Sequence, residues 1–83
     1  MKILYFAWLR SKLGMAEETI TLPSDVTTLY QLVDHLKSRG PAFAEVFDDL
    51  DVIRIAVDQE YVTTDIPLAD ASEIAFFPPV TGG

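Results

Sequence analysis

Apolar positions at the start of the chain follow the two-residue period of a β-strand. Residues 2–9 are apolar on both alternations, with Ile3, Tyr5 and Ala7 on one side and Leu4, Phe6 and Trp8 on the other. This pattern predicts a strand that is covered on both faces. After a turn around Leu13 and Gly14, residues 17–22 alternate as a half-exposed strand, with Glu18, Ile20 and Leu22 facing one way and Thr19 and Thr21 the other. We expect the two strands to form a hairpin.

The middle of the chain has the pattern of an amphipathic helix. Thr28 and Gln31 have the T-x-x-Q spacing of a capping box, in which each side chain satisfies a free backbone N–H of the first turn. The next apolar residues recur at helical spacing and predict one buried stripe: Leu29, Leu32, Val33 and Leu36. Basic residues and then helix breakers are expected to end this helix: Lys37, Arg39, Gly40 and Pro41.

The rest of the chain predicts a short helical segment and three strands. Residues 42–47 form the helical segment, whose apolar side chains cover the edge of the sheet: Phe43, Val46 and Phe47. The predicted strands are residues 52–58, a short return at 61–62 after a turn at 58–60, and residues 73–77. This order indicates a two-layer α+β domain with one main helix packed on one face of the sheet. A right-handed crossover through the helix sets the last strand parallel to the first and places both in the middle of a mixed sheet.

Composition is typical of a single small domain. The chain has 83 residues, of which 49% are hydrophobic, which is enough material for one core. Cys is absent, so a disulfide framework, a thiolate metal site and a cysteine nucleophile are excluded. No run approaches the roughly 20 apolar residues of a membrane span, and no leader cleavage site is visible, so we expect a cytoplasmic protein that does not bind a membrane.

Negative charge is concentrated in the second half of the chain. Residues 1–40 carry five basic and four acidic side chains, for +1, whereas residues 41–83 carry Arg54 against nine acids, for −8. Such a surface repels phosphate backbones and attracts basic partners, so nucleic-acid binding is not expected. That the acidity only aids solubility is an equally weighted alternative.

Candidate chemistry within the body of the domain is sparse. His35 is the only histidine and lies off the apolar stripe, which favours a solvated helix residue over a catalyst or ligand. Asp48, Asp49 and Asp51 form a carboxylate cluster without EF-hand spacing or a histidine partner, which favours loop charge over a metal site. No metal or bound cofactor is therefore expected. The body resembles a carrier or binding module more than a self-sufficient enzyme.

The run FFPPVTGG gives the C-terminal end of the sequence a specific chemical character. Pro78 and Pro79 favour extended polyproline geometry, and a Gly-Gly end without Cβ atoms fits a narrow channel. Residues 78–83 reach about 20 Å when extended. The reactive group would be the α-carboxylate of Gly83, which another protein would adenylate with ATP. A sulfur donor would then displace AMP and leave a thiocarboxylate.

The whole sequence resembles the MoaD family of ubiquitin-like β-grasp proteins, the small sulfur-carrying subunits of molybdopterin synthase. The resemblance includes Phe6 in the opening apolar strand, the capped helix from Thr28, the AVD segment, and the run L-x-D-x-x-E-I-A-F-F-P-P-V-T-G-G from Leu68. Two departures are visible. Asp58 replaces a common Asn, and Ala71-Ser72 stands where relatives tend to have Gly-Asp. Both lie in predicted turns and leave the end of the chain unchanged.

The resemblance implies a β-grasp domain over residues 1–77 and a flexible C-terminal tail over residues 78–83. Gly83 would be the reactive residue, as glycyl adenylate and then 1-thioglycine. The other tail residues would enter the active site of a partner: Gly82, Thr81, Val80, Pro79 and Pro78. The sulfur would pass to cyclic pyranopterin monophosphate and build the dithiolene of molybdopterin, in molybdenum cofactor biosynthesis. The chain itself would be non-catalytic.

The implied partners are a large catalytic subunit and an E1-like adenylyltransferase that recharges the tail with ATP. Two small and two large subunits would form a heterotetramer, and the substrate pocket would belong to the large subunit because the carrier is acidic. At the exposed end of the central strands, Phe6, Tyr61 and Phe77 are predicted to contact the large subunit, with core packing as the alternative for each.

Three other functions remain open from the sequence. A sulfur carrier for thiazole or tRNA thiolation would use the same tail chemistry, although such carriers usually lack the FFPPVTGG ending. A ubiquitin-like modifier would join Gly83 to a lysine. A plain interaction domain would function equally well without its last residue.

Overall fold

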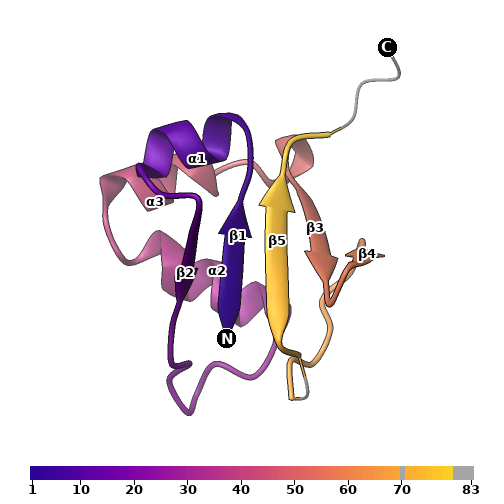
Figure 1. The fold of residues 1–83 in the computed structure, drawn as a ribbon. Coiled ribbons are helices and arrows are strands. Elements are labelled where there is room, and N and C mark those ends of the chain that lie inside the picture. The colour runs from indigo at the N-terminus through magenta and orange to yellow at the C-terminus, as the bar shows by residue number, and fades with distance from the viewer. Residues whose placement is uncertain (70, 80–83) are drawn as a thin grey trace.

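Five strands form one mixed sheet in the order β2-β1-β5-β3-β4 (Figure 1). A computed structural model describes residues 1–69 and 71–79 of the chain. The strands are β1 Lys2–Tyr5, β2 Glu17–Thr19, β3 Arg54–Val57, β4 Glu60–Val62 and β5 Glu73–Phe77. The helices are α1 Trp8–Leu13, α2 Leu29–Lys37, α3 Pro41–Val46 and the short 3-10 helix η1 Leu50–Val52.

The first and last strands lie side by side within the sheet. β1 pairs with β5 in parallel, with Tyr5 opposite Phe76, and β5 also pairs antiparallel with β3. β2 and β4 pair antiparallel at the two edges, with β1 and β3 respectively. The α+β class, the parallel pairing of the first and last strands and their internal positions are therefore confirmed.

Residues 6–9 do not continue β1, which corrects the predicted strand over residues 2–9. Ala7 has φ 55° and ψ −129°, and this conformation turns the chain from β1 into α1, which begins at Trp8. The helix ends at Gly14, which adopts the left-handed conformation (φ 74°) and donates its backbone N–H to the carbonyl of Arg10. Apolar composition misled the strand prediction because Phe6 and Trp8 lie on the surface rather than under a second layer.

Two other predicted strands are shorter in the structure. Residues 20–22 leave the ladder after Thr19, although the Ile20 N–H still donates to the Met1 carbonyl at 2.9 Å. β3 begins only at Arg54, because Val52 belongs to η1, whose turn starts from the Asp49 side chain. The predicted last strand agrees with β5 at both ends.

The capped helix is confirmed. The Gln31 backbone N–H donates to Thr28 Oγ1 at 3.3 Å, and the Thr28 backbone N–H donates to Gln31 Oε1 at 3.1 Å. All four residues of the predicted apolar stripe are buried: Leu29, Leu32, Val33 and Leu36. The short helix α3 is confirmed as well, with Val46 and Phe47 buried and Phe43 half-buried against the same core.

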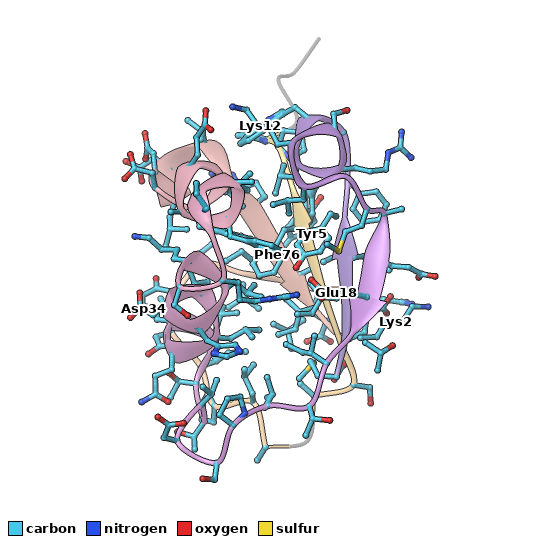
Figure 2. All side chains as sticks on the ribbon, turned by 90° about the vertical axis from the view of Figure 1, so that its left-hand side faces the viewer. Lys2, Tyr5, Lys12, Glu18, Asp34 and Phe76 are labelled. Atoms are coloured by element: carbon cyan, nitrogen blue, oxygen red, sulfur yellow. The ribbon has the colours of Figure 1, made fainter. Side chains whose placement is uncertain are left out.

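The core lies between the helices and one face of the sheet. Figure 2 shows Tyr5 and Phe76 pointing into this layer, whereas Lys2 lies on the outer side of the sheet. Every buried residue of the described chain is hydrophobic. The second face of the sheet has no covering layer in the described chain. Among the described residues, no helix is long and apolar enough to cross a membrane.

Candidate functional site

The site begins with β5, because this central strand leads directly into the C-terminal tail. Ile74 and Phe76 are fully buried on the helix side of β5, and Phe77 lies half-buried on the other side. The ring of Phe76 stacks on Tyr5 with centroids 6.1 Å apart and meets the edge of Phe47 at 4.9 Å. These contacts hold the last described strand firmly within the core.

The chain leaves the sheet at Pro78 and Pro79. The Phe76 carbonyl accepts a hydrogen bond from the Phe6 N–H at 3.1 Å, and the two prolines that follow Phe77 have no N–H with which to extend the ladder. Both prolines are half-buried. The other predicted tail residues lie outside the described residues: Val80, Thr81, Gly82 and Gly83. The boundary between domain and tail at residue 78 stays a prediction.

The three predicted contact residues lie outside the buried core. Phe6 is 47% exposed and Tyr61 is 72% exposed, while Phe77 is half-buried. The rings of Tyr61 and Phe77 meet edge to face with centroids 5.6 Å apart, so β4 and β5 present a joined aromatic surface. Phe6 follows β1, which pairs with β5 on its other side. We call Phe6, Tyr61 and Phe77 the tail-root surface.

Trp8 is a further exposed aromatic residue that the sequence reasoning assigned to a strand. It begins α1 and is 37% exposed, whereas Leu9 is the residue of that helix that enters the core. The sequence did contain a helix signal, because Arg10 and Lys12 precede Gly14 as basic residues precede a C-terminal glycine cap. That signal outweighs the alternating pattern here.

A polar cluster behind β1 supports the strand from the helix side. The Tyr5 hydroxyl donates to Glu18 Oε2 at 2.7 Å, and Arg39 Nη1 donates to both oxygens of the same carboxylate at 2.9 and 2.8 Å. The Arg39 guanidinium also lies 4.6 Å from the centroid of the Phe43 ring. Burial, and then the hydrogen bond to Glu18, raise the pKa of Tyr5 well above its usual value.

The other candidate residues have local structural roles. Asp49 caps η1, accepting from the Asp51 N–H at 2.9 Å, and His35 is a half-buried residue of α2. Within residues 1–69 and 71–79, no group of three His, Cys, Asp or Glu side chains is placed to hold a metal ion. Arg54 pairs with Phe77 across β3 and β5, and its Nη1 donates to the carbonyls of Asp51 and Ile53.

Comparisons with known proteins cover the whole chain, tail included. The sequence pattern of the ThiS family matches residues 3–83. The chain is 36% identical over 83 residues to the molybdopterin synthase sulfur carrier subunit of Escherichia coli (strain K12), covering 100% of this chain and 99% of that protein. It is 38% identical over 84 residues to the protein of the same name from Dictyostelium discoideum, covering 99% and 94% of the two chains.

Two solved structures have the same arrangement of helices and strands. The crystal structure of SAMP1 from Haloferax volcanii superposes with a TM-score of 0.75 at 30% identity, covering 100% of this chain and 98% of that one. A putative molybdopterin converting factor, subunit 1, from Pyrococcus furiosus superposes with a TM-score of 0.73 at 34% identity, covering 95% of each chain. The expected β-grasp fold is thereby confirmed.

Proposed function

We propose that this chain, which belongs to the ThiS family, is the sulfur carrier subunit of a molybdopterin synthase. The observation that carries the proposal is the match to full-length relatives of that name, in an alignment that covers this whole chain. The position of the tail supports it, because a firmly packed central strand leads straight to Pro78 and Pro79. A sulfur carrier subunit of a synthase implies a catalytic partner subunit.

The proposed chemistry takes place on the α-carboxyl group of Gly83. A carboxylate oxygen attacks the α-phosphorus of ATP on an adenylyltransferase, which forms an acyl-adenylate and releases pyrophosphate. A sulfur nucleophile then attacks the acyl carbon, expels AMP and leaves a thiocarboxylate. In the large subunit, the thiocarboxylate sulfur forms a C–S bond with a carbon of cyclic pyranopterin monophosphate as a C–O bond at that carbon breaks, and water then cleaves the acyl–sulfur bond to restore the carboxylate. ATP is consumed by the activating enzyme and is not a bound cofactor of this chain.

In this proposed chemistry, the carrier provides a tail long enough to enter a partner's active site, and the partner proteins provide the active sites. Six residues from Pro78 to Gly83 extend about 20 Å, and the two prolines keep the first part of that length extended. The chain has a net charge of −7, which disfavours binding of the substrate phosphate, so the substrate pocket belongs to the large subunit. Two carriers and two large subunits form the proposed heterotetramer.

Deletion of Gly83 is the sharpest test of this proposal. The deletion moves the terminal carboxylate about 3.5 Å back along an extended chain, whereas an active site tolerates misplacement of only about 1 Å. We expect thiocarboxylate formation and molybdopterin synthesis to fall at least about a hundredfold. Addition of one residue after Gly83 should be as harmful, because it converts the reactive carboxyl group into an amide.

Intact mass after incubation with ATP, the activating enzyme and a sulfur donor measures the thiocarboxylate directly. Molybdopterin yield with the large subunit measures transfer, and circular dichroism should show unchanged folding because a terminal glycine buries no side chain. Wild-type yield from either variant contradicts the sulfur-carrier function. An isopeptide-linked target protein would instead favour a modifier, and transfer only to a thiazole or tRNA pathway would favour another carrier role.

The tail-root surface is the proposed contact with the large subunit. Phe77→Ala should weaken association by about 2 kcal/mol, roughly thirtyfold in Kd, because aromatic residues at the centre of an interface commonly dominate its energy. Isothermal titration calorimetry measures the affinity, and thermal unfolding of the isolated variant measures its stability. Tyr30→Ala removes an exposed aromatic from α2 and is the matched control. If Phe77→Ala melts the domain while its folded fraction binds normally, Phe77 is a core residue.

A further inference from the structure

Trp8 is an exposed aromatic residue that the tail-root surface does not include. It is 37% exposed and follows Phe6, which is 47% exposed, by two residues, while Leu9 alone of α1 is buried. Large apolar side chains that gather on a surface mark interaction sites more often than isolated ones do. Tryptophan is also one of the residues enriched among those that dominate binding energy.

The backbone between Phe6 and Trp8 is strained in a way that presents both rings. Ala7 has φ 55° and ψ −129°, a conformation of tight turns that glycine adopts at little cost and alanine does not. Such strain costs on the order of 1–3 kcal/mol and tends to persist at functional sites. Here it reverses the direction of the chain, so that Trp8 begins a helix outside the sheet and is not buried as a strand residue.

Trp8 lies at the end of the sheet from which the tail departs. The Phe6 N–H donates to the Phe76 carbonyl at 3.1 Å, so β1 and β5 end side by side. Figure 1 shows α1 at the same end of the molecule as the carboxyl end of β5. Because consecutive Cα atoms are about 3.8 Å apart, the Trp8 Cα lies within about 8 Å of the Phe6 Cα.

The distance from Pro79 to the proposed reactive residue Gly83 determines what must cover this end. Gly83 is four residues beyond Pro79 in the sequence, which is at most about 14 Å of extended chain. A protein that holds Gly83 in its active site must therefore approach Pro79 within that distance and cover the surface around it. Given the proposed function, we infer that Trp8, beside Phe6, inserts its indole ring into an apolar pocket of the large catalytic subunit. Trp8 thereby extends the tail-root surface from the sheet onto α1.

The single tryptophan of this chain permits a test without any substitution. Carrier labelled with 5-fluorotryptophan gives one ¹⁹F resonance, because Trp8 is the only tryptophan. On saturation with unlabelled large subunit, that resonance should shift and lose its H2O/D2O solvent isotope effect, because the ring becomes inaccessible to water. An unchanged resonance in the saturated complex overturns the inference.

Substitution then measures the importance of the contact. Trp8→Ala should raise the Kd for the large subunit about tenfold or more, and Trp8→Phe should raise it less. Tyr30→Ala, which removes a 43% exposed aromatic from α2, should leave the Kd unchanged.

The outcomes separate this inference from the proposed function. If wild-type carrier yields no molybdopterin with the large subunit, the proposed function fails and this inference fails with it. If the wild type is active but Trp8→Ala binds the large subunit as tightly, only the inference fails. A Trp8→Ala defect confined to thiocarboxylate formation also overturns it, because the contact then belongs to the activating enzyme. Equal losses from Trp8→Ala and Tyr30→Ala overturn it as well.

Discussion

The Asp58 carboxylate holds the loop that precedes the central strand β5. Asp58 and Gln59 both have positive φ, 49° and 71°, as in the two-residue turns that join β-hairpins. Asp58 Oδ1 accepts from the N–H groups of Ser72 and Glu73 at 2.9 and 3.0 Å, just where β5 begins. The two departures from the MoaD pattern, Asp58 and Ala71-Ser72, are therefore in direct contact. Asn presents the same Oδ1 acceptor and tolerates the same backbone conformation.

Substitutions at Asp58 should show whether the loop requires the hydrogen-bond acceptor Oδ1 or the negative charge of the carboxylate. Asp58→Ala should lower the free energy of unfolding by about 2 kcal/mol, because it removes two hydrogen bonds and places Ala in the left-handed region. Asp58→Asn should change it by less than about 0.5 kcal/mol. Urea denaturation measures both, and similar losses from the two variants would mean that the negative charge, and not the acceptor, is what the loop requires.

Elements with strong local signals could be predicted from the sequence. The capping box at Thr28, the apolar stripe of α2 and the β-rich run of β5 each combine a start, a period and a stop that agree with one another. The sequence also indicated the exposed positions of Phe6 and Tyr61, although only as one of two alternatives. The tail chemistry was predicted from residue type alone and stays a prediction, because Pro fixes the backbone and Gly frees it wherever they stand.

The start of α1 could not be predicted by the same reasoning, although Arg10, Lys12 and Gly14 signal its end. Alternation fits a strand only if both faces are covered, and here Phe6 and Trp8 are exposed. The turn is formed by Ala7 and not by a glycine, so no residue type in the sequence indicates it. The structure tolerates the strained Ala7 because the packing of Leu9 in the core compensates for its strain. Nothing in the residue types of this segment says which apolar side chains belong to the core and which to the surface.

The capping box gives a prediction at the scale of the helix. Thr28→Ala should destabilise the domain by about 1 kcal/mol, because the Gln31 N–H loses its acceptor. Gln31→Ala should cost a similar amount, because Gln31 Oε1 accepts from the N–H groups of both Thr27 and Thr28. The double variant, measured by thermal unfolding, should lose less than the sum of the two. Full additivity would show that the two side chains act independently.

At the scale of the molecule, one cluster joins the sheet to the helices. Tyr5 comes from β1, Glu18 from β2, Arg39 follows α2, and Phe43 lies in α3. The Glu18 carboxylate lies between the Tyr5 hydroxyl and the Arg39 guanidinium, and that guanidinium packs on Phe43. Because the Glu18 side chain is only 14% exposed, compared with 57% for Glu17 in the Lys2 ion pair, its hydrogen bonds are worth more than those of that pair.

This cluster predicts a loss of stability in alkali. Burial raises the pKa of Tyr5 above that of a tyrosine in the unfolded chain, which ionises near pH 10. The stabilising contribution is complete below about pH 10 and is lost as pH rises further, since the unfolded chain then releases a proton that the folded protein retains. Tyr5→Phe should be less stable at pH 7 by about 1–2 kcal/mol.

Above pH 10 the two proteins should converge. Stability of wild type and Tyr5→Phe, measured by urea denaturation from pH 8 to 11, gives the difference that belongs to Tyr5, because all other titrating groups are shared. A difference that stays constant across this range would show that Tyr5 ionises equally in both states.

The parallel pairing of β1 with β5 also has a consequence during synthesis. β1 can pair with its central neighbour β5 only after residues 73–77 have emerged from the ribosome. The sheet therefore stays incomplete while the earlier segments are being synthesised. Such non-local pairing slows folding, because a long loop must close before any contact between the strands is made. The same strand that completes the fold carries the tail at its end. The tail therefore becomes available on a folded domain only after residues 73–77 have joined the sheet.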